Sequence, residues 1–174
     1  MITVILNKNK YLTQEDYDYF IKNLNIHQLK CSCGICGNHI KHGYYRRSIK
    51  TPQGKIKIKI LRVICKLCKK THAIFPSEIV PYSQTQLCDH IKIIKAYESQ
   101  SSFEPIMEQN QFIDESNIEY INQKYLQHWK ERLASINLSL VDDIIKIATQ
   151  CLTLFSKQFM QIKSAPNKLF VKPT

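Results

Sequence analysis

The sequence lacks any long hydrophobic run. No stretch of its 174 residues approaches the roughly 18 consecutive apolar residues of a membrane-spanning helix. The apolar run within the N-terminal "MITVILNKNKYLTQ" is too short for a signal peptide. These absences predict a soluble, cytoplasmic protein with no membrane partner, long enough for one medium domain or two small ones.

Recognisable catalytic motifs are also missing. The sequence has no Gly-rich phosphate loop, no nucleophile elbow and no His-x-Glu deaminase signature. Paired-carboxylate chemistry would need acids held on a strand-rich core. The acids after residue 80, such as Asp89, Asp114, Asp142 and Asp143, fall at predicted helix starts or on polar helix faces, where they act as caps. We therefore expect a protein that is not an enzyme.

Acidic residues are nearly absent from one segment. The formal charge of the chain is +11, yet residues 1–29 and residues 81–174 are each neutral overall, and residues 30–80 carry twelve Lys and Arg against Glu78 alone. Four zinc-bound thiolates would remove about two positive charges from this segment. The remaining excess is typical of a surface that binds phosphates, and predicts a nucleic-acid partner. The alternative is a solvated charged face in a chain whose composition favours Lys, Ile and Asn.

Cysteine is concentrated in this same segment. Five of the seven cysteines lie in "CSCGICG" and "CKLC", and the pairs Cys33/Cys36 and Cys65/Cys68 have Cys-x2-Cys spacing. That spacing lets two thiolates of one turn bind the same ion. In a reducing compartment such clusters favour metal binding over disulfides. We predict a structural Zn²⁺ closed by these four thiolates, with no open position for a reactive water.

Other residues offer alternatives to this ligand set. Four nearby side chains can substitute for a ligand or lie next to the site: Cys31, His39, His42 and His72. Without a metal, the cysteines would be buried thiols. That is the role we predict for Cys88 and Cys151, which fall in helical apolar patterns.

The residues between the cysteine pairs predict a β-hairpin. In "HGYYRRSIKTPQGKIKIKILRVIC" two strands flank a turn at residues 51–54. Lysines at 55, 57 and 59 alternate with isoleucines, so one face is basic and the other apolar. The alternation changes phase after Ile60, which predicts a bulge or twist there. A hairpin bracketed by metal-binding turns is a zinc ribbon, here residues 30–80, and residues 1–29 before it predict a short strand and a helix capped by Thr13.

After the predicted ribbon, the apolar residues recur at helical spacing. Residues 81–135 predict a helix to about Glu98, a short second helix from Ser101 or Ser102, and a third capped by Asp114 or Ser116. This is the outline of a helix-turn-helix unit, although any small three-helix bundle gives the same pattern.

A last helix is predicted in residues 136–174. It starts at Ser139 with Asp142 in its capping-box position, and its broad apolar arc suits a core helix or a homodimer contact. An extended tail follows it. The predicted fold class is therefore α+β, a small four-cysteine zinc ribbon (a β-hairpin) followed by a mainly α-helical, helix-turn-helix-like bundle.

Candidate DNA contacts fall on two elements. On the hairpin they are basic residues beside Tyr44 and Tyr45, namely Arg46, Arg47, Lys50, Lys55, Lys57 and Lys59. Such contacts fix position on DNA more than they read sequence. On the third helix the residues away from the apolar stripe include Asn117, Tyr120, Gln123, Lys124 and Gln127. Asn and Gln can pair with adenine edges, although a plain solvated helix face would look the same.

The block "RVICKLCKKTHAIFPSEIVPYS" and the cysteine turns carry a family resemblance. The chain resembles, over roughly residues 30–174, an uncharacterised bacterial family with a zinc ribbon followed by a helix-turn-helix-like region. The ribbon is also similar to the N-terminal DNA-binding portion of insertion-sequence transposases. This likeness implies a mobile-element setting and zinc ligation by Cys33, Cys36, Cys65 and Cys68. The chain departs from such ribbons at Lys69, where Gly often follows the last Cys, and it ends where a transposase would begin its catalytic domain.

Together these patterns predict a nucleoid-associated, zinc-dependent protein that binds double-stranded DNA. It would serve as an accessory factor or regulator of a mobile element, with a transposase or another mobile-element protein as a further partner. The alternative is a protein-interaction adaptor, whose ribbon and apolar last helix dock a transposase or polymerase.

Overall fold

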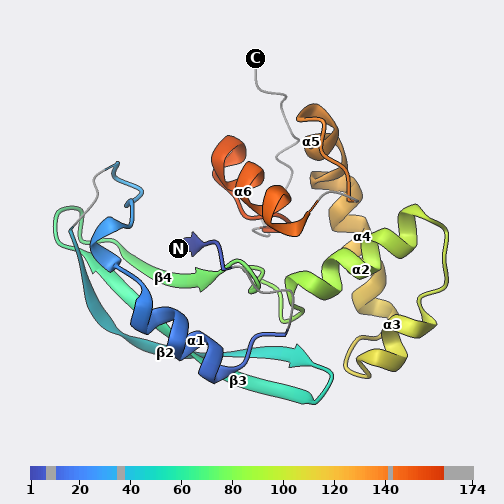
Figure 1. Cartoon of the computed structure of the whole chain (residues 1–174), viewed down its shortest axis with the longest axis horizontal. Helices are drawn as coiled ribbons and strands as arrows, with labels where there is room; N and C mark the ends of the chain where they lie inside the picture. Colours follow the sequence, from blue (N-terminus) through green and yellow to red (C-terminus); the bar gives the residue numbers. More distant parts are fainter. Residues whose placement is uncertain (7–10, 35–37, 141–142, 163–174) are drawn as a thin grey trace.

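The computed structural model describes residues 1–6, 11–34, 38–140 and 143–162, which form an α+β fold. The first part contains a four-stranded mixed sheet and its covering helix (Figure 1), made of β1 (Ile2–Val4), α1 (Gln14–Asn23), the 3-10 helix η1 (Ile26–Gln28), β2 (His39–Thr51), β3 (Gly54–Cys65) and β4 (Thr71–Pro76). The second part is helical, made of α2 (Leu87–Glu98), α3 (Glu104–Gln109), α4 (Glu115–His128), α5 (Lys130–Ser135) and α6 (Ile144–Phe155). None of the helices in the described ranges is long and apolar enough to cross a membrane.

The predicted hairpin is confirmed. Strands β2 and β3 pair antiparallel from His39 opposite Cys65 to Thr51 opposite Gly54. Ile58 and Ile60 are buried, whereas the lysines that alternate with them are exposed. In Figure 1 the hairpin curves along the lower part of the molecule and α1 lies across it. The cysteine end of the hairpin lies away from the helical part, whose α4 contacts the other end of the hairpin through Asn117 and Lys50 (Figure 1).

The bulge lies elsewhere than predicted. Pairing continues without interruption past Ile60, and the register shifts instead between Lys41 and Gly43 of β2. The alternation in β3 changes because Leu61 and Val63 are buried as well. The strand is covered on both faces at this point, and a strand with two buried faces shows no polar alternation.

Two strands extend the sheet beyond the hairpin, in the order β1-β4-β3-β2. β4 pairs antiparallel with β3 near the cysteine end, and β1 pairs parallel with β4.

Where β3 and β4 diverge, side chains of α1 supply hydrogen-bond partners for the backbone of the two strands. The Tyr17 hydroxyl accepts a hydrogen bond from the Leu61 N–H at 2.8 Å and donates one to the Ile74 carbonyl at 3.0 Å. Gln14 Oε1 accepts from the Lys59 N–H at 2.7 Å.

The Tyr17 bridge provides a stability test. Tyr17→Phe would leave a buried N–H and a buried carbonyl without their partner, which should lower the free energy of unfolding by about 2 kcal/mol. Urea unfolding measures the change. Tyr19→Phe on the same helix is the control, because Tyr19 is 72% exposed, and should leave the midpoint unchanged. Equal midpoints for the two variants would contradict the assigned role.

The helices occur close to where the sequence predicts them, except that the third predicted helix is divided at Trp129 into α4 and α5, and the last helix starts later than predicted. α4 is capped by Asp114, whose side chain accepts from the Asn117 N–H. The last helix, α6, begins at Ile144, capped by Asp143, so the predicted start at Ser139 is wrong. Asp142 and the tail from residue 163 lie outside the described residues. The arrangement of α2, α3 and α4 as a helix-turn-helix stays a prediction.

One acid does not act as a cap. Asp89, in the first turn of α2, is buried and accepts hydrogen bonds from the Tyr11 hydroxyl and, at 3.1 Å, from the Asn110 amide. Burial raises the pKa of this carboxyl. Asp89 thus links the start of α2 to the segments that contain Tyr11 and Asn110. The sequence predicted only a cap or a polar helix face for this acid, so these buried contacts were not predicted.

Candidate metal centre and basic surface

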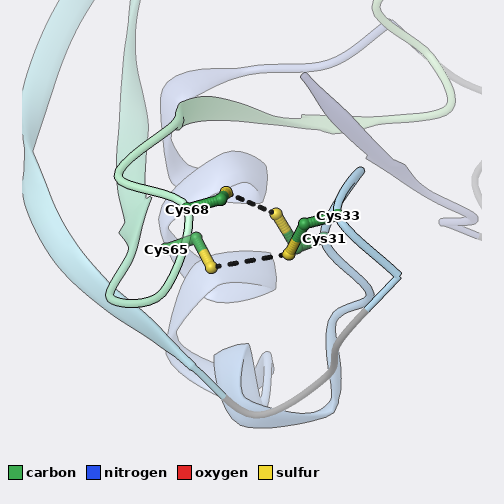
Figure 2. A group of neighbouring side chains, drawn as sticks. All are labelled: Cys31, Cys33, Cys65 and Cys68. Carbon is green, nitrogen blue, oxygen red and sulfur yellow. Dashed lines mark hydrogen bonds between the residues drawn. The ribbon is translucent and has the colours of Figure 1, made fainter.

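Four cysteine side chains converge at one end of the sheet. Cys31 and Cys33 precede β2, Cys65 ends β3, and Cys68 lies in the turn to β4 (Figure 2). All four sulfurs lie within 4.8 Å of one another, with Cys31 Sγ 3.5 Å from Cys68 Sγ and Cys33 Sγ 3.9 Å from Cys65 Sγ. Tetrahedral zinc with Zn–S bonds of about 2.3 Å needs sulfurs about 3.8 Å apart. The donor set therefore fits a metal ion held by four thiolates.

Two tight turns position the sulfurs. Gly34 has a φ of +90°, and its N–H donates to the Cys31 carbonyl at 2.9 Å. In the second turn Lys69 has a φ of +59°, and its N–H donates to the Cys65 carbonyl at 2.9 Å. Lys69 thus adopts the left-handed conformation that favours glycine.

The environment of Cys31 favours the metal-binding form of its thiol. A hydrogen bond from the Cys33 backbone N–H is the largest cause that lowers the pKa of Cys31, to about 5. Because thiolates rather than thiols bind metals, this lowered pKa favours coordination at Cys31. The pKa of Cys68 is shifted the other way: despite a hydrogen bond from the Lys70 backbone N–H, burial and the neighbouring cysteine side chains raise it to about 11. Burial instead raises the pKa of Cys88 and of Cys151 to about 12, as expected for structural thiols outside a metal centre.

The cluster overlaps the ligand set predicted from spacing. Cys33, Cys65 and Cys68 come together as predicted, whereas Cys36 lies outside the described residues. Cys31, which the spacing suggested only as an alternative, joins them. A Cys-x-Cys pair is a weaker sequence signal than Cys-x2-Cys, so spacing alone did not favour it.

The choice between Cys31 and Cys36 can be tested by substitution. Because the four described cysteines suffice as a tetrahedral ligand set, we expect Cys31→Ser to reduce the zinc content of the purified chain by at least half. Cys36→Ser should retain it. Elemental analysis of both variants, purified in parallel with the wild type, measures the difference. Zinc loss in Cys36→Ser alone would restore the set predicted from spacing.

One face of the hairpin carries exposed basic side chains. Arg46 pairs with Lys59 and Ser48 with Lys57, so Arg46, Lys57 and Lys59 share this face, and Lys55 continues it toward the turn. Lys59 Nζ lies 4.6 Å from the centre of the Tyr44 ring, which is itself 43% exposed. A hollow of about 450 Å³ separates this face from α1, lined by Gln14, Asp18, Tyr44, Arg46, Lys57 and Lys59.

Two predicted DNA contacts are engaged inside the protein. The Arg47 guanidinium donates to the carbonyls of Val80 at 3.0 Å and Ser83 at 2.6 Å. Lys50 is 9% exposed and its amine donates to the Asn117 side chain, while desolvation lowers its pKa. Both residues join the hairpin to the helical part of the chain.

Apart from Asn117, which Lys50 binds at the junction with the hairpin, the predicted contacts on α4 lie on its outer side. Tyr120 is 46% exposed, and Lys124 Nζ lies 5.6 Å from its ring centre. The Gln123 amide donates to Glu119 one turn earlier at 3.2 Å. Asn117 lies at the junction with the hairpin, beside a hollow of about 220 Å³ that Tyr82 and Tyr120 also line.

Comparison with known proteins identifies one family. The family model described as "Domain of unknown function (DUF6431)" matches residues 31–119. The match spans the four clustered cysteines, the whole hairpin and the start of α4. Neither curated proteins nor solved structures yield a match.

Proposed function

We propose that this chain, which belongs to the family described as "Domain of unknown function (DUF6431)", binds double-stranded DNA through its basic hairpin face. In this proposal it is a non-catalytic, zinc-dependent accessory protein or regulator of a transposon-like mobile element. The observation that carries the proposal is the confinement of the chain's net charge to residues 30–80, together with the exposure of Arg46, Lys55, Lys57 and Lys59 on one face of the hairpin. The mobile-element setting rests on the sequence resemblance to transposase N-terminal regions.

The spacing of the exposed lysines suits a phosphate backbone. Alternate residues of a strand lie about 6.6 Å apart on one face, so the three lysines from Lys55 to Lys59 extend over about 13 Å. Duplex DNA carries one negative charge per roughly 1.7 Å of its axis. Several phosphates can therefore face the hairpin at once. Arg46 adds a planar donor group beside Lys59, suited to paired contacts with one phosphate.

The junction between hairpin and α4 supports a combined surface. The Lys50 amine holds Asn117 at the start of α4, so the hairpin and the helix expected to read bases are neighbours. Hairpin contacts would fix the position on DNA, and exposed Tyr120 and Gln123, with half-buried Lys124, would supply sequence preference.

A specific observation favours the adaptor as the second candidate. A hollow of about 690 Å³ with mainly apolar walls lies among α2, α3 and α4, and includes Phe103, Met107 and Leu126. Such a surface suits a protein partner, and its affinity would respond weakly to salt. DNA affinity falls steeply with salt, because phosphate contacts release counterions.

Selection from a random duplex library by the zinc-loaded chain tests the proposal. An enriched motif would support sequence reading by α4, and Gln123→Ala would then be expected to relax one position of that motif. Retention without enrichment would support a hairpin that only holds DNA for a partner. No retention at moderate salt would contradict DNA binding and favour the adaptor.

A further inference from the structure

The side chain of His39, the first residue of β2, is buried. It is 0% exposed, and neither ring nitrogen has a hydrogen-bond partner among residues 1–6, 11–34, 38–140 and 143–162. A neutral imidazole has one N–H donor and one acceptor nitrogen. Leaving both unsatisfied in the interior is costly, and such groups in native proteins usually have an unseen water or ion as their partner.

His39 belongs to a second group of metal-binding side chains, next to the cysteine cluster. Ligand atoms of Cys31, His39 and His72 lie within 4.8 Å of one another, and all three residues are buried. His72 Nε2 lies 3.3 Å from Cys31 Sγ, and the two imidazole rings meet edge to face with centroids 5.7 Å apart. Around a tetrahedral zinc, bonds of about 2.0 Å to nitrogen and 2.3 Å to sulfur put the two ligand atoms about 3.5 Å apart.

We propose that Cys31, His39 and His72 form a second metal site, distinct from the four-cysteine site. One thiolate and two imidazoles favour a borderline-soft divalent ion, of which Zn²⁺ is the most suited to this ligand set and to tetrahedral geometry. The Cys31 thiolate is common to both groups and bridges the two ions. Three protein ligands leave one position of the second ion for a water molecule or a small anion.

The alternative assigns His72 a hydrogen bond to the Cys31 sulfur and no metal. It accounts for the 3.3 Å contact, but leaves both nitrogens of His39 without a partner in the described part of the chain. The two accounts differ in metal content and in the effect of removing His39. Neither difference depends on whether the protein binds DNA.

Zinc content of the full chain, purified with zinc and dialysed against trace zinc, is the first measurement. We expect two zinc ions per chain, and X-ray absorption should show nitrogen ligands at about 2.0–2.1 Å besides sulfur at about 2.3 Å. One zinc per chain with only sulfur ligands would overturn the second site and leave the first intact. No bound zinc would overturn both sites.

His39→Leu separates the accounts further. If the wild-type chain holds the second ion, the variant should bind one zinc instead of two and melt at a lower temperature than the wild type in zinc-containing buffer. If the wild-type chain has no second ion, the substitution only removes two unsatisfied polar atoms. The zinc content should then stay unchanged and the melting temperature should rise, and this result would overturn the proposal. His42→Leu is the matched control, because His42 is exposed three residues along the same strand and should keep both ions.

Discussion

Cys65→Ser is expected to release zinc from the four-cysteine site and to unfold the cysteine end of the sheet. Cys65 is 0% exposed and is the last residue of β3, so an ion held by the four cysteines would be linked directly to the hairpin through its thiolate. Metal binding and folding are one equilibrium in such modules. At free zinc about 1,000 times the dissociation constant, loss of binding removes about 4 kcal/mol from the free energy of unfolding.

Partial rather than complete unfolding is expected, because the sheet also has a hydrophobic core of its own around Ile58, Ile60 and Tyr17. Zinc analysis together with urea unfolding measures the effect. Cys33→Ser should behave in the same way, and Cys88→Ser, outside the cluster, is the control. Undiminished zinc in both Cys33→Ser and Cys65→Ser would contradict the metal centre.

Replacing Arg46, Lys57 and Lys59 together with glutamine is expected to weaken duplex DNA binding by about 10–100-fold at low salt. Each lost phosphate contact also removes about one unit from the slope of log affinity against log salt, so the slope should decrease by about 3. Fluorescence anisotropy with a labelled duplex measures both quantities. The zinc content should stay unchanged, because none of the three residues touches the cysteine cluster.

The control removes the same charge from other elements. Lys22, Lys95 and Lys130 are exposed on α1, α2 and α5, and their joint replacement with glutamine should leave the affinity within about twofold, because they lie outside the hairpin face. Equal losses in the two triple variants would indicate that net charge alone, and not the hairpin face, attracts DNA.

The hairpin could be predicted because its signals are local. Alternating Lys and Ile in residues 55–60 and the turn residues at 51–54 specify two strands and their faces. The same reasoning did not distinguish the exposed basic residues of β2 from those that bind other parts of the protein. Arg47 pairs with Ile58 on the apolar face and is used inside the protein, whereas Arg46 is exposed.

Features that depend on distant segments were missed. β4 is short and largely buried, so it has no clear alternation, and its parallel pairing with β1 joins residues more than 70 positions apart. The hydrogen bonds of Tyr17 and Gln14 to β3 are likewise tertiary. Cys31 and His72 meet only because β4 returns beside β3, which no spacing rule could indicate.

The most direct test of the central claim is the salt dependence of duplex DNA binding by the zinc-loaded wild-type chain. Anisotropy titrations from about 50 to 200 mM salt should show affinity falling by at least tenfold, as expected when several lysines displace counterions. Absence of binding at 50 mM salt, or an affinity that stays constant across the series, would contradict DNA binding by the hairpin.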